Sequence, residues 1–167
     1  MAYSSVVKVK RDGAVIFADN SGFGGANVLT IEKEPGDFNM SAPRPARNNF
    51  LDRGRLVSSV RLGDDQPLTG SFSSYFRDAT DAGVATLMDL LNWSGWLGSN
   101  WVSTLGSNAE VKAVDLRHTI EGSDHGDGAD HSITITDVSL DYSYAEGDPN
   151  TLSVNWQSHT DHTPTLA

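Results

Sequence analysis

Short runs in which apolar and polar residues alternate recur along most of this chain, and a period of two is typical of half-buried β-strands. The runs predict strands over residues 5–10, 14–18, 28–34, 56–62, 67–76 and 110–120. We expect the first two to form a hairpin around Arg11-Asp12-Gly13, and the runs 56–62 and 67–76 to pair around a turn at Gly63-Asp64-Asp65. The pattern therefore predicts a mainly β fold.

The most regular pattern is a predicted hairpin of residues 132–144 and 151–157 around a loop at residues 146–150. Its apolar face runs to Ile135 and resumes at Val138, a slip of one residue that predicts a β-bulge near Thr136-Asp137. Two interpretations of the opposite face stay open. It is either an ordinary solvated face of an antiparallel sheet, or a surface along which a polyanion can move without being bound. This face has no Lys or Arg, and its candidate residues are Ser139, Asp141, Ser143, Thr151, Ser153 and Asn155.

One segment has a helical period. Asp78 and Asp81 stand at N-cap and N3 spacing, and apolar residues follow at i, i+3, i+4 and i+7, namely Val84, Leu87, Met88 and Leu91. This predicts one helix over residues 79–92 that packs an apolar stripe on the sheet. Because no repeat or linker divides the chain, we expect residues 1–167 to form one domain. Its predicted fold is an antiparallel β-sandwich or partly closed barrel flanked by the helix.

Residues 35–55 contain three prolines and no clear period, which predicts a long loop or arm that reaches another subunit. The window 44–61 holds five of the 12 basic residues of the chain, namely Arg44, Arg47, Arg53, Arg55 and Arg61. Against the single acid Asp52 they give this window a charge of about +4. The remaining 7 basic and 21 acidic residues give −14, which brings the net charge to −10.

A chain with a cationic arm and a large acidic surface can dock the arm on a copy of itself. Charge complementarity of this kind steers association and sets its register more than it adds affinity. Every basic residue in the window is Arg, which forms bidentate pairs with carboxylates at interfaces. A phosphate site and a solvated loop stay open as alternatives for the arm. The charge pattern favours self-assembly over catalysis.

The bulk composition narrows the class of protein further. A pI near 4.7 argues against a protein that binds nucleic acid tightly, because neutralising phosphates needs Lys and Arg. It is compatible with a protein along which nucleic acid moves without tight binding. With no Cys, disulfides and thiolate metal sites are excluded. No apolar run reaches the ~18 residues of a membrane span, and residues 1–13 do not resemble a signal peptide. We therefore expect a soluble protein kept in a cytoplasm, with no membrane partner.

Two clusters could carry chemistry. Segment 124–131 contains three Asp and two His, which can bind Ca²⁺ or a transition metal, but its spacing matches no known ligand motif and it is rich in glycine. We expect a solvated loop there and no metal. The tryptophans Trp93, Trp96 and Trp101 could stack on sugars, but we expect them to pack in the core or in a subunit contact. No nucleophile elbow, P-loop or dinucleotide motif occurs, so the sequence predicts no enzyme, no catalytic residue and no cofactor.

The order of these elements resembles the tail tube proteins of long-tailed bacteriophages, a major tail protein family related to the tube proteins of contractile injection systems. The resemblance covers most of the chain as a pattern of elements. Its matching parts are the early strands, the loop at 35–55, the stretch GDDQPLTGSFSSYFRD at residues 63–78, the single helix and the final hairpin.

What the resemblance implies is a structural virion protein of which six copies form a ring, with stacked rings forming the tail tube that conducts viral DNA during ejection. In that family the long loop reaches an adjacent ring and the lumen is usually negative. The arginine arm would then stack the rings, and the cation-free hairpin face would line the lumen. Expected partners are further copies of the chain and the sheath, tape-measure, baseplate and terminator proteins, in the virion after assembly in the host cytoplasm. Sheathed and unsheathed tails both stay open.

Two other classes are compatible with the sequence. A calcium-dependent, lectin-like β-sandwich would bind carbohydrate through the Asp/His loop and exposed tryptophans. A hydrolase would use carboxylates that lie far apart in the sequence. Assembly into rings or tubes distinguishes the structural hypothesis from both.

Overall fold

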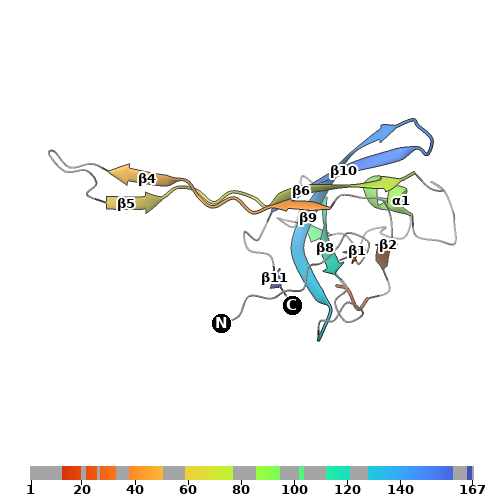
Figure 1. Ribbon diagram of the computed structural model, residues 1–167, viewed down its shortest axis with the longest axis horizontal. Coiled ribbons are helices and arrows are strands. Elements are labelled where there is room, and N and C mark those ends of the chain that lie inside the picture. Colours follow the sequence, from red (N-terminus) through yellow and green to blue (C-terminus); the bar gives the residue numbers. More distant parts are fainter. Residues whose placement is uncertain are drawn as a thin grey trace.

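The computed structural model describes residues 13–19, 22–25, 27–32, 38–50, 59–76, 86–94, 102–103, 112–120, 128–159 and 165–166. Figure 1 shows a curved sheet with a short helix beside it and a long two-stranded extension that projects from one side. The strand predicted over residues 5–10 lies outside the described residues. In chain order the elements are β1 (Gly13–Ala18), β2 (Val28–Glu32), β3 (Asn39–Ser41), β4 (Arg47–Phe50), β5 (Ser59–Leu62), β6 (Thr69–Tyr75), α1 (Leu87–Leu91), β7 (Val102–Ser103), β8 (Lys112–Ile120), β9 (His131–Ala145), β10 (Thr151–Ser158) and β11 (Thr165–Leu166).

Antiparallel pairing joins the strands of the main sheet in the order β2-β1-β8-β9-β10-β6-β3, with β11 beside β9 and β7 beside β8. Strands β4 and β5 form a separate two-stranded sheet. The predicted fold class is confirmed: the protein is mainly β and antiparallel, consistent with a β-sandwich, and the sheet is not closed into a barrel. The final hairpin is confirmed as β9 and β10.

A single strand, β9, belongs to both layers of the fold. Its first part pairs with β8 and its second part with β10, and the change comes where Thr136 and Asp137 lie opposite the one residue Asp115. The φ angle of Asp137 is 51°, a left-handed conformation that redirects the strand. This confirms the predicted β-bulge. The bulge stands at the corner where β9 passes from one layer to the other.

Hydrogen bonds satisfy the backbone around the bulge. The Asp137 N–H donates to Asp115 Oδ1 at 3.3 Å, and the Ser158 hydroxyl donates to the Thr136 carbonyl at 3.0 Å. The His159 N–H donates to the Asp137 carbonyl at 3.0 Å. Burial raises the pKa of the Asp115 carboxyl, although the hydrogen bond from Asp137 opposes that rise. The corner is thus tied both to β8 and to the end of β10.

The core lies between the two halves of the sheet and the helix. Phe17 of β1 and Phe72 of β6 meet with ring centroids 5.7 Å apart, although three strands separate β1 from β6 in the pairing order. The sheet therefore folds back over itself. The same cluster holds the buried side chains of Val15, Leu68, Leu90, Leu91, Val114, Leu116, Ile135, Val138, Leu140, Leu152, Val154 and Trp156.

The helix α1 is shorter than predicted. Thr86 has the extended conformation of an N-cap and forms a capping box with Asp89, whose N–H donates to Thr86 Oγ1 at 3.1 Å. One continuous helix over residues 79–92 is therefore wrong, because Thr86 within that range is extended; residues 79–85 lie outside the described residues. Among the described residues, no helix has the length and apolar content of a membrane span. Of the predicted apolar stripe, Leu87, Met88 and Leu91 pack against the core, together with Leu90, which was not predicted; Val84 lies outside the described residues.

The described parts of the segment predicted as a loop and of the strands predicted after it form one long two-stranded ribbon, whose root is β3 paired with β6 and whose outer part is β4 paired with β5. We call residues 42–50 and 59–68 of this ribbon the arm (Figure 1). The turn predicted at Gly63-Asp64-Asp65 is wrong, since the chain runs on from β5 into β6 and the Gly63 N–H donates to the Ala46 carbonyl at 2.7 Å. Pro43 and Pro45 lack the N–H groups that a continuous ladder needs, so pairing resumes only beyond them.

A glycine makes room for Trp156 at the root of the arm. Trp156 of β10 lies opposite Gly70 of β6, and a Cβ at Gly70 would collide with the Trp156 ring and with the Asn39 carbonyl. Phe38, directly before β3, stacks on Trp156 with centroids 5.9 Å apart and on His118 with centroids 4.3 Å apart. The arm therefore starts from a packed aromatic stack.

We expect Gly70→Ala to lower the free energy of unfolding by about 1–3 kcal/mol, because an added methyl group overfills a packed site. Gly24→Ala is the matched control: nothing lies within 4 Å of the added Cβ, so its effect should stay within about 0.5 kcal/mol. Chemical denaturation followed by tryptophan fluorescence measures both. Equal stability of Gly70→Ala and the unsubstituted protein would contradict the close contact with Trp156.

Candidate assembly surfaces

The side of the sheet that faces away from the core is one continuous polar surface over four strands. Partners in an antiparallel pair point to the same side, so register identifies its members. Strands β9 and β10 contribute the six residues that the sequence predicted, and β6 and β3 extend the surface on the other side of β10. We call it the polar face, and it consists of Ser139, Asp141, Ser143, Thr151, Ser153, Asn155, Gln157, Thr69, Ser71, Ser73, Tyr75, Asn39 and Ser41.

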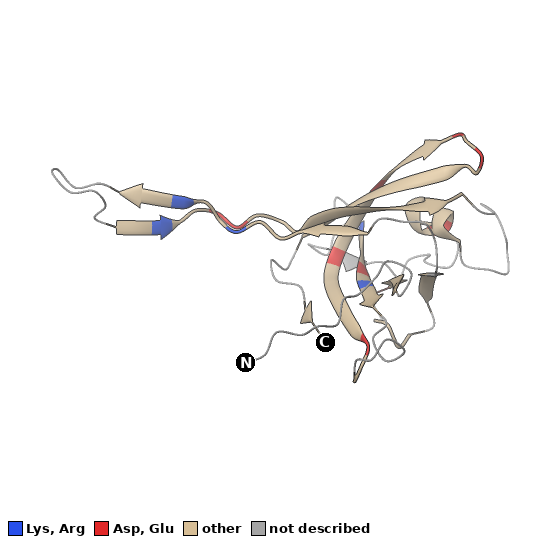
Figure 2. Cartoon of the chain, in the orientation of Figure 1, with Lys and Arg blue, Asp and Glu red and all other residues tan. Residues whose placement is uncertain are grey.

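The polar face carries one carboxylate, that of Asp141, and no Lys or Arg. Figure 2 shows no basic residue along β9 or β10. Soluble surfaces ordinarily intersperse charges of both signs, so a nearly uncharged face over four strands departs from the usual composition. Proteins hold nucleic-acid backbones mainly through cations. This face offers a polyanion no such group.

Several side chains of the polar face are already hydrogen-bonded within the protein. The Asn39 amide donates to Ser71 Oγ at 2.7 Å and its oxygen accepts from the Ser71 N–H at 3.1 Å. The Ser139 hydroxyl donates to the Gln157 carbonyl at 3.4 Å and lies 2.8 Å from His159 Nε2. These bonds occupy donors that could otherwise turn toward a passing phosphate.

Sequence reasoning missed the part of this face that β6 and β3 supply. The alternation of Ser71 and Ser73 with the buried Phe72 and Ser74 was visible in the run 67–76. We paired that run with residues 56–62, whereas the structure pairs it with β10 and β3. The strand order, more than the pattern of any strand, decides how wide the polar face is.

The outer part of the arm has solvent on both sides. All four side chains of β4 and all four of β5 are exposed. Among the described residues, neither a third strand nor a covering layer lies on this ribbon, and an isolated two-stranded ribbon is only marginally stable in water. A contact with another molecule would supply such a layer.

The two faces of the arm differ in how much apolar surface they leave uncovered. On one face, Leu62 lies opposite Arg47 and shares its side of β5 with Val60; Leu62 and Val60 are 69% and 55% exposed. On the other face, the Arg61 guanidinium lies over the ring of Phe50, 5.6 Å from its centroid, and covers part of it. The face with Leu62, Val60 and Arg47 is therefore the more open one.

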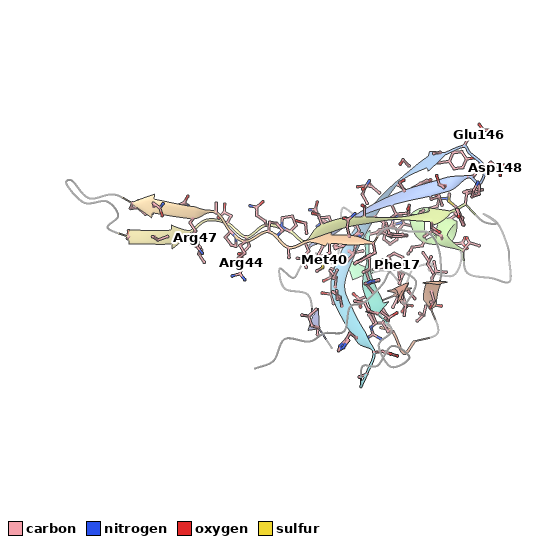
Figure 3. The ribbon with its side chains drawn as sticks, in the orientation of Figure 1. Phe17, Met40, Arg44, Arg47, Glu146 and Asp148 are labelled. Atoms are coloured by element: carbon pink, nitrogen blue, oxygen red, sulfur yellow. The ribbon has the colours of Figure 1, made fainter. Side chains whose placement is uncertain are left out.

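The arm carries the described part of the predicted arginine cluster, namely Arg44, Arg47 and Arg61 (Figure 3 labels the first two). The other two predicted arginines lie outside the described residues, namely Arg53 and Arg55. Asp64 and Asp65 also belong to the arm, and their carboxylates offset part of its positive charge. The cationic character is thus concentrated in residues 47–62, where four arginines stand against one acid.

The far end of the β9–β10 hairpin is a second exposed surface. The Tyr142 hydroxyl donates to Asn92 Oδ1 at 3.2 Å, and the Tyr144 ring lies edge-on to Phe76 with centroids 5.4 Å apart. The two rings are 41% and 50% exposed, so they are held in place and still accessible. Exposed carboxylates follow at the turn of the hairpin. We call this surface the hairpin tip, which consists of Tyr142, Tyr144, Glu146 and Asp148.

The remaining candidates have fewer described contacts. Of the Asp/His segment, the structure describes residues 128–131, all exposed, while residues 121–127 lie outside. Within the described ranges, no three His, Cys, Asp or Glu side chains are grouped so that they could share a metal ion. Trp93 packs partly buried against the core, as predicted, and Lys112 Nζ lies 6.0 Å from its ring centroid. Trp96 and Trp101 lie outside the described residues.

Comparison of the chain with known protein families finds no matching family model, and comparison with curated proteins finds no match. The resemblance to tail tube proteins therefore stays a prediction. The geometry of the polar face and the arm is the basis for a functional proposal.

Stability should fall as the pH drops below about 6.5, the ordinary pKa of histidine. Burial lowers the pKa of His118, and a backbone hydrogen bond at Ala14 offsets this only partly. The folded protein thus favours neutral His118. Below pH 6.5 the unfolded state binds a proton at this residue more readily than the folded state does, so the free energy of unfolding falls. Melting temperatures between pH 7.5 and pH 5.5 should fall less for His118→Phe than for the unsubstituted protein. Parallel slopes for the two proteins would contradict this assignment.

Proposed function

We propose that this protein is a structural virion subunit that assembles with copies of itself into stacked hexameric rings, a tail tube through which viral DNA passes. The observation that carries the proposal is the polar face: four neighbouring strands with hydroxyl and amide side chains, one carboxylate and no cation. A conduit for a polyanion needs a wall that is well hydrated and offers no counterion. The proposed lumenal residues include those predicted from sequence, namely Ser139, Asp141, Ser143, Thr151, Ser153 and Asn155.

The arm supports the same proposal independently of the polar face. Its outer side chains are exposed, and it projects well beyond the body of the subunit (Figure 1). In the proposed tube it reaches a copy in the adjacent ring, where arginines meet carboxylates. Such pairs are worth only ~0.2–1 kcal/mol each when exposed, but a ring would repeat them in every subunit.

Electron microscopy of the purified protein in negative stain tests the proposal directly. We expect rings of uniform diameter, and tubes of stacked rings at higher protein concentration. A protein that stays monomeric at every concentration and salt condition tested would overturn the proposal. Calcium-dependent binding of a glycan by that monomer would instead support the lectin-like alternative.

Replacing Ser139 and Ser143 with Lys should leave tube assembly intact and impair DNA passage. Each lysine adds a cation to the wall, and each phosphate that it neutralises strengthens DNA binding. The control is the double replacement by Gln, which adds similar bulk without charge. Infectivity of particles that carry either variant is the measurement. Equal infectivity of the Lys and Gln variants would contradict a lumenal position for these strands.

Changing Arg44, Arg47, Arg53 and Arg55 to Ser should abolish ring stacking while the subunit keeps its fold. Each arginine contributes one weak pair, so single changes should have little effect on stacking. Stacking should fail when all four pairs of each subunit are lost. Added salt should also weaken ring stacking, because the Debye screening length shortens to ~3 Å at 1 M salt. Circular dichroism and melting temperature check the fold, and microscopy checks stacking.

The matched control replaces the same four arginines with Lys and keeps the charge. It should stack better than the Ser variant, though less well than the unsubstituted protein, since Lys lacks bidentate geometry. Long tubes built by the Ser variant would exclude the arm as the stacking element.

A further inference from the structure

We infer that the hairpin tip is the surface that receives the arm of a second copy, so that subunits join head to tail. This inference rests on the proposed self-assembly and names the partner surface within it. It commits to one occupant of the tip, the arm face that carries Leu62, Val60 and Arg47.

The position of the two surfaces makes the contact intermolecular. Figure 3 shows Arg44 and Arg47 on the arm at one end of the molecule, and Glu146 and Asp148 on the tip at the opposite end. The arm cannot reach the tip of its own subunit. An arm can reach the tip of the next copy along the same axis, and the charges of the two ends are complementary (Figure 2).

The two surfaces also match in their apolar content. Among the described residues, the large hydrophobic side chains that are exposed are three on the arm, two on the tip and Leu166 of β11. In the described part of the chain outside the arm, exposed aromatic rings and carboxylates thus stand together at the tip. Tyrosine is enriched in interface contacts because its ring packs and its hydroxyl stays hydrated.

The aromatic side chains of the tip are already ordered in the free subunit. The Tyr142 hydroxyl bond to Asn92 and the edge-on packing of Tyr144 on Phe76 hold both rings in place before any partner arrives. Rings that are already ordered lose little side-chain entropy on binding. The arm ribbon can then lay Leu62 and Val60 across the rings while Arg47 lies near Glu146 and Asp148.

The contact is heterologous: one subunit contributes its arm and the next its tip. A heterologous contact leaves a free arm at one end and a free tip at the other, so it propagates unless a rotation closes it. In the proposed tube this is the contact between successive rings.

Charge reversal tests the pairing. An acidic-arm variant carries Arg44→Glu and Arg47→Glu, and a basic-tip variant carries Glu146→Lys and Asp148→Lys. We expect each variant to remain as single rings, and a chain with all four changes to regain tubes because the attraction is restored with exchanged signs. Asp130→Lys, at an exposed acid away from the tip, should stack normally. A four-change chain that stays unstacked, or a basic-tip variant that stacks as well as the Asp130→Lys control, would overturn the inference.

Mixing tests the direction. A Leu62→Ser, Arg47→Ser protein has a defective arm and an intact tip, and a Tyr144→Ser, Glu146→Ser protein has the converse. Each alone should give single rings, and an equal mixture should give pairs of rings and no longer tubes, since only one of the two possible contacts is intact. Microscopy and sedimentation velocity distinguish these species. Failure of the mixture to form pairs would contradict head-to-tail docking.

A matched pair of leucines tests the apolar part. Leu62 and Leu166 are 69% and 71% exposed, but only Leu62 lies on the proposed docking face. Leu62→Ser should raise the protein concentration needed for tube formation by about tenfold, while Leu166→Ser should leave it unchanged. Equal effects of the two changes would count against the arm–tip contact.

These results separate the inference from the proposed function. If the unsubstituted protein forms tubes and the tip variants form them equally well, the tip is not the receiving surface and the tube remains. If the unsubstituted protein forms neither rings nor tubes, both fail together.

Discussion

The β-bulge in β9 is the constraint on which the architecture depends. Because two residues there oppose the single Asp115, β9 leaves one layer and enters the other without a loop. The corner allows Phe17 of β1 to pack against Phe72 of β6, and so closes the core. It also lets the second part of β9 run on past the core beside β10. That second part of β9 contributes Ser139, Asp141 and Ser143 to the polar face and Tyr142 and Tyr144 to the hairpin tip.

Alternation along a single strand then separates two kinds of surface. Beyond the bulge, Asp141 and Ser143 point to the polar face, while Tyr142 and Tyr144 continue the apolar side after the core has ended. A polar surface without cations and a surface with exposed aromatic rings therefore lie back to back on the same strand. Strand β3 extends the polar face on the far side of β6, and the chain continues from β3 into the arm.

The sequence predicted the elements whose side chains divide cleanly between core and solvent. The alternation of β9 and β10, the bulge and the six outward residues were all readable because one face of each strand is buried. The arm was predicted only in part: β5 falls within the strand predicted over residues 56–62, whereas β4 was expected as loop, because β4 and β5 are exposed on both faces and show no clear alternation of buried and exposed residues. The width of the polar face depends on strand order, which is a long-range property. The start of α1 was misplaced because Asp78 and Asp81 have the same N-cap and N3 spacing in the sequence as the capping box of Thr86 and Asp89.

The placement of the arm and the hairpin tip at opposite ends of the subunit has a consequence for how an assembly would begin and finish growing. A polymer joined by such a contact is polar, with unoccupied arms at one terminus and unoccupied tips at the other. The two termini are chemically distinct, one cationic with exposed aliphatic side chains and the other anionic with exposed tyrosines. A protein that initiates growth would have to imitate one of these surfaces, and a protein that stops it would have to imitate the other.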